Sequence, residues 1–202
     1  MGRASTVDER RARILEAAIV VLARDGIAET TTRKIATEAD VNQAMLRYYF
    51  GSKEDLLFAV LLEMMRQTRE VVQQASLSGG DLRALIQESL LSFWQQFESR
   101  PELQVMQYEL TLYALRNPAS AWLARQQYDG YCAVVETLLA EGFASIGQES
   151  AVPLPELARF VVSGVDGLIL QFVSAPDPAR ARRDLDNLTS AVIALVAGDS
   201  AR

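Results

Sequence analysis

Gln43, Ala44, Arg47 and Tyr48 are spaced so that one face of a short helix would carry an amide, a small side chain, a guanidinium and a phenol. Lys53 follows just beyond them. Amide and guanidinium groups match the hydrogen-bonding edges of bases in a DNA major groove, and cations match the phosphates. The alternative is an amphipathic helical hairpin whose charged groups are merely solvated. The spacing alone leaves both interpretations open.

The first element that would position this face is a short helix ahead of it. Thr31 is a suitable N-cap, because its hydroxyl can accept a hydrogen bond from a backbone N–H of the first turn. Apolar residues then recur at the spacing of one buried face, at Ile35, Ala36 and Ala39. We expect this helix to pack its apolar side inward.

A turn and a second helix follow. Asp40 is one of the few non-glycine residue types that tolerate a left-handed backbone, and Asn42 is a good N-cap. The second helix is predicted from Gln43 to Phe50, with Leu46 and Phe50 on its inward side. Two short helices joined by such a turn form a helix-turn-helix, a motif with which proteins bind DNA.

A larger set of residues around this segment agrees in type and spacing with a known signature: Thr31, Thr32, Arg33, Lys34, Ile35, Ala36, Ala39, Val41, Leu46, Tyr48, Phe50, Ser52, Lys53, Glu54 and Leu56. It resembles the DNA-binding signature of the TetR family of bacterial transcriptional repressors, over about a quarter of the chain. The family's pattern places an amphipathic helix just ahead. Thr6 with Glu9 suits the start of that helix, and Gly26 suits its end.

The resemblance implies roles for individual residues. Base contacts fall to Arg33 and Gln43, whose forked groups suit guanine and adenine respectively, with Ala44 and Arg47 beside them. The positions that hold the DNA backbone in TetR-like proteins are here Thr32, Tyr48, Tyr49 and Lys53. Two residues depart from the family pattern, since Asp40 replaces a glycine and Arg47 a tyrosine. The second departure concerns which operator is bound, not whether DNA is bound.

The remainder of the chain indicates an all-α fold, with an N-terminal three-helix helix-turn-helix domain (1–55) and a larger helical ligand-binding and dimerisation domain (56–202). No alternating strand pattern occurs. Ser52 suits the N-cap of a long helix that residues 78–80 would end, and a second helix is predicted from Asp81 to Phe97. Ser99 with Glu102 forms a capping-box pattern for the next helix, which would run to about Arg116. Asn117 and Pro118 suit the start of a helix to about Ala144.

Charge and composition fit a DNA-binding regulator of the cytoplasm. The net charge is −6, yet residues 1–53 carry nine Lys and Arg against seven Asp and Glu, while the rest carries eleven against nineteen. The basic end therefore coincides with the motif. The apolar runs read as too short and too interrupted by charge to span a bilayer, and the N-terminus lacks the apolar core of a signal peptide. A single cysteine, Cys132, fits a reducing compartment.

The last two helices, roughly 155–174 and 178–197, are unusually apolar. They are either interior helices or an interface. The resemblance implies the interface, because TetR-like proteins pair these helices with those of a second copy. The predicted dimer contacts are Gly164, Gly167, Leu168, Leu188, Val192 and Leu195. Such a homodimer would present two recognition helices to a palindromic operator.

Enzymatic chemistry finds little support. The chain has no histidine and one cysteine, so the commonest general base and metal ligands are missing, and we expect no catalysis, cofactor or metal site. Two carboxylates lie in apolar surroundings, Glu109 and Asp166. For Asp166 we favour a structural hydrogen bond. For Glu109 an exposed face, a structural pair and a ligand contact are all open.

The resemblance also implies a small-molecule effector that binds the C-terminal helices and releases DNA. Candidate lining residues are Trp94, Gln107, Tyr108, Glu109, Tyr113, Tyr128 and Tyr131, and they suit a small, largely apolar molecule. Aromatic residues at such positions are more often core than ligand contacts. The prediction is therefore a homodimeric regulator, most simply a repressor. The alternatives are an activator of the same fold and a helical small-molecule-binding protein or enzyme that keeps the N-terminal domain, residues 1–55 and called the head below, as a scaffold.

Overall fold

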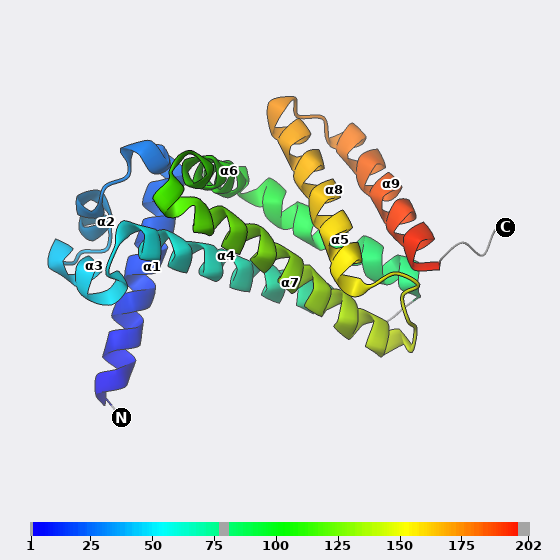
Figure 1. Ribbon diagram of the computed structural model, residues 1–202, viewed down its shortest axis with the longest axis horizontal. Coiled ribbons are helices and arrows are strands. Elements are labelled where there is room, and N and C mark those ends of the chain that lie inside the picture. Colours follow the sequence, from blue (N-terminus) through cyan, green and yellow to red (C-terminus); the bar gives the residue numbers. More distant parts are fainter. Residues whose placement is uncertain (1, 77–80, 198–202) are drawn as a thin grey trace. The chain divides into compact units, whose positions relative to one another are not determined.

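The structure, a computed structural model, describes the backbone of residues 2–76 and 81–197 and the side chains of 7–73 and 81–197. Throughout these ranges the regular secondary structure is helical, which confirms the predicted all-α class (Figure 1). The elements are α1 (Gly2–Glu29), α2 (Thr32–Glu38), α3 (Gln43–Phe50), α4 (Lys53–Ser76), α5 (Leu82–Ser99), α6 (Pro101–Arg116), the 3-10 helix η1 (Pro118–Ser120), α7 (Ala121–Ile146), α8 (Leu154–Ser174) and α9 (Pro178–Ala197).

The chain forms two compact units. The first comprises the chain up to Met64 together with Arg100–Gln127, and the second comprises Met65–Ser99 and the chain from Tyr128 onward. Helices α4 and α7 each contribute to both. The assignment of 1–55 to DNA binding and 56–202 to effector binding and dimerisation is a separate, functional division, and it stays a prediction.

In the first unit, α1 supplies the central apolar face, with Ile14, Ala18 and Val21 wholly buried. It packs against α2 and α6, and α2 packs against α3. Helix α1 begins at Gly2, ahead of the start predicted near Thr6, whose side chain lies outside the described residues. At Gly26 the backbone leaves the helical region with φ 75° and ψ 167°, so the predicted stop is a sharp kink before a last short turn.

Two side-chain caps predicted for helix starts are not formed. Ser99 is the last residue of α5, and its hydroxyl donates to the Gln96 carbonyl instead of capping α6. Helix α6 begins with Pro101, which fixes a helical φ at the first position and disfavours it in the preceding residue. Asn117 makes no capping bond either, since its amide donates to the Tyr113 carbonyl and the chain passes through η1 before α7.

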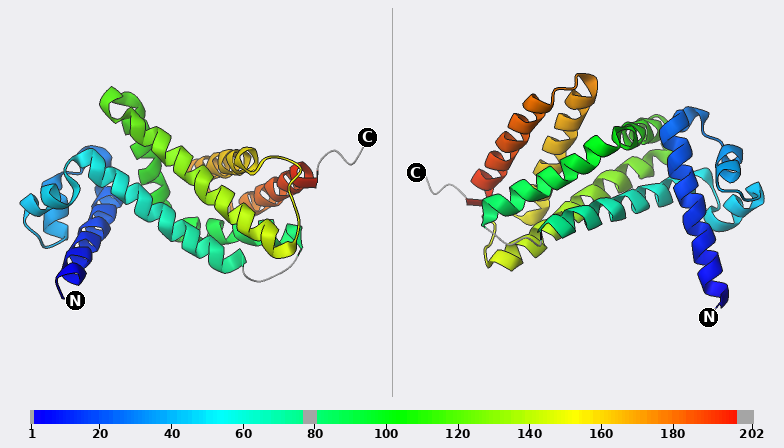
Figure 2. Two further views of the ribbon diagram at one scale, coloured as in Figure 1. Left: turned by 60° about the horizontal axis from the view of Figure 1, so that its bottom comes forward. Right: turned by 180° about the vertical axis from the view of Figure 1, so that it is seen from behind.

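In the second unit, α8 and α9 lie side by side as an antiparallel pair (Figures 1 and 2), and α5 packs against α9. A Cβ atom on Gly164 would lie 2.6 Å from Leu188 Cδ1, so Gly164 allows close approach of α9 within the same chain. Leu188 is buried and Val192 is 0% exposed. Both side chains are covered by their own chain, so their burial does not support the predicted dimer contact at Leu188 and Val192, which stays a prediction.

Helix α8 also corrects the expectation that no apolar run could span a bilayer. An 18-residue window of this 21-residue helix has a mean hydropathy of 1.5, so the helix is long and apolar enough to cross a membrane, and 28% of that window is buried within the chain. A stripe of residues at helical spacing is exposed along it: Phe160, Ser163, Gly167, Leu170 and Ser174. The apolar members of this stripe, Phe160 and Leu170, are left exposed by the chain itself.

Candidate nucleic-acid interface

The predicted caps of the two motif helices are present. Thr31 Oγ1 accepts a hydrogen bond from Lys34 N at 3.2 Å, and Asn42 Oδ1 accepts one from Ala44 N at 2.9 Å. Between them, Asp40 has φ 51°, the left-handed conformation expected for the turn. These local bonds fix where α2 and α3 begin.

Helix α3 divides into the two faces that its sequence predicts. Leu46 and Phe50 are buried, and the guanidinium of Arg11 lies 5.1 Å from the centre of the Phe50 ring. The opposite face is exposed and carries Gln43, Ala44, Arg47 and Tyr48. Tyr48 is 80% exposed, so its phenol is open to a partner. Tyr49 is half-buried and packs its ring edge-to-face on that of Tyr48 at 5.1 Å.

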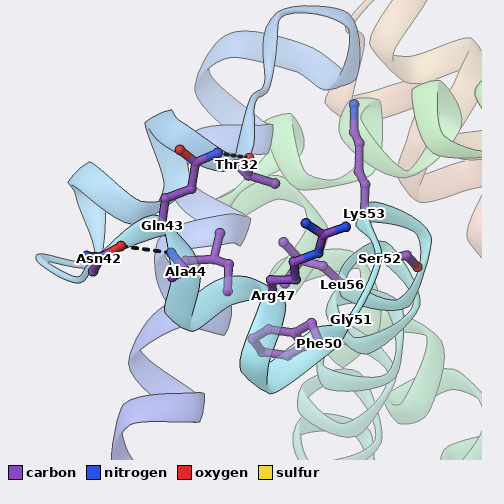
Figure 3. A pocket seen from close by; sticks show the side chains of 11 residues that line it. Thr32, Asn42, Gln43, Ala44, Arg47, Phe50, Gly51, Ser52, Lys53 and Leu56 are labelled. Carbon is purple, nitrogen blue, oxygen red and sulfur yellow. Dashed lines mark hydrogen bonds between the residues drawn. The ribbon is translucent and has the colours of Figure 1, made fainter.

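A groove of about 520 Å³ lies beside this face, between α3 and the start of α4. Its wall includes Gln43, Arg47 and the Gly51–Lys53 segment, as Figure 3 shows. The Gln43 side-chain amide donates a hydrogen bond of 2.7 Å to the Thr32 hydroxyl, which sets the plane of the amide. The groove therefore joins hydrogen-bonding groups from α2, α3 and the start of α4 on one surface.

The charges around the motif fall into paired and open groups. Lys34 pairs with Asp25 at 3.0 Å, and Arg24 pairs with Asp25 at 2.8 Å and with Glu38 at 3.0 Å. The hydrogen bonds from Arg24 and then from Lys34 hold the pKa of Asp25 below its usual value. These pairs join α1 to α2. Arg33 and Arg47 are exposed, and among the residues the structure describes neither forms an ion pair.

Lys53 is oriented differently from the expectation of a phosphate contact. Its Nζ donates to the carbonyl oxygens of Ile27, at 3.5 Å, and Thr30, at 3.4 Å. It also lies 5.6 Å from the centre of the Tyr113 ring. In Figure 3 the side chain extends away from Arg47. To reach a phosphate the ammonium group would have to leave these carbonyls.

Helix α4 is capped as predicted, by Ser52. Its hydroxyl accepts from Asp55 N at 3.0 Å and donates to Asp55 Oδ2 at 2.6 Å, and Ser52 N donates to the same carboxylate at 3.2 Å. This reciprocal arrangement is a capping box with aspartate at its third position. The hydrogen bonds from Ser52 lower the pKa of Asp55.

Glu109 and Tyr113, both on α6, contact the end of α1 and the start of α4 respectively. Glu109 Oε2 accepts a hydrogen bond of 2.9 Å from Ile27 N, which favours the structural interpretation of this carboxylate over a ligand contact. The Tyr113 hydroxyl donates to Glu54 Oε1 at 3.0 Å, and burial followed by that hydrogen bond raises the pKa of Tyr113. Both proposed pocket residues are thus engaged with the head.

The remaining candidates for an effector pocket are distributed between the units. Gln107 and Tyr108 belong to the first, whereas Trp94, Tyr128 and Tyr131 belong to the second. Trp94 is buried and packs edge-to-face on Phe97 and Phe172. The Tyr128 ring lies against that of Tyr131, and its hydroxyl donates to Asp166 Oδ2 at 2.7 Å, the structural bond expected for this carboxylate. Their role in effector binding stays a prediction.

Residues 14–60 match the family model of bacterial regulatory proteins of the tetR family, and residues 81–197 match that of the tetracyclin repressor-like C-terminal domain. The chain is similar to the nicotine-responsive transcriptional repressor HdnoR of Paenarthrobacter nicotinovorans, with 32% identity over 95% of this chain and 97% of that one. The chain belongs to the TetR family. As a TetR-family protein it is a transcriptional regulator with a DNA-binding helix-turn-helix and a ligand-binding C-terminal domain.

Solved structures of other proteins are similar to this chain. The multidrug binding protein EbrR, whose crystal structure contains imidazole, is 31% identical with a TM-score of 0.65, over 90% of this chain and 89% of that one. A TetR-type regulator from Rhodococcus sp. has a TM-score of 0.76 over 94% and 99% of the two chains, at 21% identity. The second likeness concerns the fold alone.

Several residues of this TetR-family head escaped prediction from the sequence. Examples are the acceptor role of Thr32 toward Gln43, the pairing of Arg24 with Glu38, and the hydrogen bond from Tyr113 to Glu54. No local pattern signals them, since their partners lie 11, 14 and 59 residues apart in the chain. Only the packing of α2 on α3, of α1 on α2 and of α6 on the start of α4 brings them together.

Proposed function

We propose that this TetR-family protein is a homodimeric repressor of the cytoplasm that binds a palindromic operator and leaves it when a small, largely apolar effector binds. The head within residues 1–55 would read DNA, and residues 56–202 would bind the effector and the second copy. The observation that carries the DNA part is the exposed face of α3, which displays Gln43, Arg47 and Tyr48 while Leu46 and Phe50 are buried.

In this proposal Arg33, Gln43 and Arg47 contact bases, with Ala44 leaving room for a thymine methyl group. Thr32, Tyr48, Tyr49 and Lys53 contact phosphates. Support comes from the guanidinium groups of Arg33 and Arg47, which are exposed and form no ion pair among the described residues. The turn between α2 and α3 adds to this, because its conformation is fixed by Asp40 and by the Asn42 cap. A helix of this size fits a major groove, and two heads roughly 34 to 36 Å apart fit successive turns of one DNA face.

Selection of bound sequences from a random DNA pool tests the DNA part directly. We expect enrichment of a palindrome whose half-sites lie about one helical turn apart. No enrichment even at low salt would reject operator binding and favour the head as a scaffold. Enrichment of a single half-site would reject the dimer and keep the DNA-reading role.

We base the proposed dimer on the exposed stripe of α8, namely Phe160, Ser163, Gly167, Leu170 and Ser174. Leu168 on α8 and Leu195 on α9 are the further proposed contacts. A Cβ atom on Gly167 would meet nothing within 4 Å, so a second helix has room to approach there. Pairing two copies would cover apolar surface that the single chain leaves exposed, so that no lipid bilayer is needed to cover it. This is why we place the protein in the cytoplasm.

For the effector we propose a small molecule with a nitrogen-containing ring. The support is the 32% identity with a nicotine-responsive repressor over almost the whole chain, and the 31% identity with a multidrug binding protein crystallised with imidazole. Nicotine is the first compound to test. Phenylcyclopentane is a suitable control, because it has the same two-ring outline without nitrogen.

Nicotine should raise the melting temperature of the protein and weaken operator binding, and operator should weaken nicotine binding by the same factor. Equal effects of phenylcyclopentane would show that the protein does not recognise the ring nitrogen, and would reject that part of the proposal. If neither compound shifts melting temperature or operator affinity, a nicotine-like effector is excluded and the DNA-binding role is untouched.

A further inference from the structure

Residues 26–31, from the kink at Gly26 to the N-cap of α2, form a corner between α1 and α2. Charged side chains from other helices hydrogen-bond to this corner. Ile27 lies in this corner, and its N–H donates to Glu109 Oε2 of α6 at 2.9 Å. Its carbonyl accepts from Lys53 Nζ of α4 at 3.5 Å, and Thr30 O accepts from the same ammonium at 3.4 Å. Both backbone groups of Ile27 are therefore bound from outside the corner.

The fit of Glu109 depends on the glycine before Ile27. With φ 75° and ψ 167°, Gly26 occupies a region of backbone space that is essentially restricted to glycine. A Cβ atom built on it would lie 3.0 Å from Glu109 Oε2. Thus the carboxylate of α6 rests against bare backbone at the kink, where it accepts an N–H that the broken helix leaves without an internal partner.

The same side of α6 also reaches the start of α4. Tyr113 lies four residues after Glu109, one helical turn further along that side. Its hydroxyl donates to Glu54 at 3.0 Å, and its ring lies 5.6 Å from Lys53 Nζ. In the sequence, the corner precedes the α2–α3 pair and the start of α4 follows it. One face of α6 therefore holds the chain on both sides of the motif.

Apolar packing between α1 and α6 resists separation, but it defines rotation poorly, because apolar contacts carry no direction. A hydrogen bond that one backbone N–H donates to a charged acceptor is directional and about twice as strong as a neutral one. Among the described side chains of α6, Glu109 is the one that hydrogen-bonds to the backbone of Ile27.

We propose that Glu109 is a positioning residue, which sets the orientation of the α2–α3 pair on α6 and thereby the half-site spacing that the regulator accepts. The proposal rests on the proposed function as a dimeric operator-binding protein. Glu109 touches no DNA in this role. Its loss should therefore change which spacings are tolerated, and leave the preferred bases of each half-site unchanged.

The test uses the selected palindrome and two derivatives in which the half-sites are one base pair closer together or further apart. Wild type should prefer the original spacing by about tenfold, the size of one unfavourable change in a site. Glu109→Ala should reduce that preference to about threefold or less. Glu109→Gln should keep it, because its side-chain carbonyl still accepts from Ile27 N. Glu102→Ala, which changes an exposed carboxylate of the same helix paired with Arg100, is the matched control.

A purely structural role gives another pattern. If Glu109 only supports folding, Glu109→Ala lowers the active fraction and weakens all three operators equally, which would overturn the positioning role. Glu109→Leu, which keeps the bulk of the side chain, provides the same comparison if the alanine variant does not fold. If wild type selects no palindrome, the proposed function itself fails. If wild type selects a palindrome, and Glu109→Ala and Glu109→Leu both keep the wild-type spacing preference, only the inference about Glu109 fails.

Discussion

The side-chain amide of Gln43 donates a hydrogen bond of 2.7 Å to the hydroxyl of Thr32, and so joins the first residue of α3 to the first residue of α2. An amide has two N–H groups and a carbonyl oxygen. With one N–H bound to Thr32, the other N–H and the oxygen are available for the two hydrogen bonds that adenine offers. In our proposal Thr32 therefore sets the plane in which Gln43 meets a base.

Thr32→Val should relax the preference for the base that Gln43 reads, because valine keeps the shape and removes the acceptor. We expect a loss of about 1 kcal/mol in discrimination at that position, at the low end of the range for a base contact. Titration of operators substituted at single positions measures it. Gln43→Ala should lose the same preference more fully, and Thr37→Val, elsewhere on α2, should lose none. An unchanged base preference in Gln43→Ala would remove Gln43 from the interface.

Lys53→Ala should weaken binding to all DNA sequences alike. If each Lys53 neutralises one phosphate, the slope of log affinity against log salt should flatten by about 0.9 per protomer. Lys53→Arg should keep most of the slope. If Lys53→Ala leaves the slope unchanged while lowering the melting temperature, Lys53 acts only through the carbonyls of Ile27 and Thr30 that it contacts in the structure.

Leu170→Glu should produce a folded monomer. Leu170 is 54% exposed, so a charge there is tolerated by the chain and opposes only the proposed pairing of α8 with a second copy. Operator affinity should fall although the head is intact. Val192→Glu is the contrasting variant and should unfold the protein, because its side chain is fully buried. Light scattering with circular dichroism separates these outcomes, and a dimeric Leu170→Glu protein would place the interface elsewhere.

Tyr128 should make stability depend on pH in the alkaline range. Burial and then the hydrogen bond to Asp166 raise the pKa of Tyr128 above its ordinary value of about 10. The unfolded chain therefore loses this proton first. The contribution is complete below pH 10 and is lost as pH rises through the folded pKa. Tyr128→Phe should make denaturation midpoints fall less steeply above pH 10, whereas Tyr48→Phe, on an exposed ring, should follow wild type.

Asp40→Gly should stabilise the head. Asp40 has φ 51°, a conformation that costs an L-residue about 1 kcal/mol and glycine almost nothing, although glycine is also more flexible when unfolded. We expect a net gain of about 0.5 kcal/mol in the free energy of unfolding. Asp40→Ala should lose stability, since alanine adopts a left-handed backbone less readily than aspartate. Chemical denaturation measures both, and a destabilised glycine variant would show that the Asp40 side chain itself contributes.

The parts of the site that sequence predicts are those whose physics is local. Asn42 caps α3 through a residue two positions away, and the alternation of Leu46 and Phe50 with exposed residues follows from helical periodicity alone. Val192 shows the limit. An apolar residue on a helix is buried against its own chain or a partner, and only the packing of α5 and α8 around α9 decides between them. Lys53 is similar, because its orientation depends on carbonyls 23 and 26 residues earlier.

The hydrogen bond between Ile27 and Glu109 joins residues 82 positions apart, whereas the bonds that define α2 and α3 lie within a few residues of one another. On the ribosome the motif helices are therefore complete before their support exists. At about 5 to 20 residues per second, synthesis of the intervening chain takes roughly 4 to 16 seconds. During that interval the apolar side of α1 that later packs on α6 is uncovered. The nascent head therefore passes through a stage with an open apolar face, and its contact with α6 forms only when α6 has been synthesised.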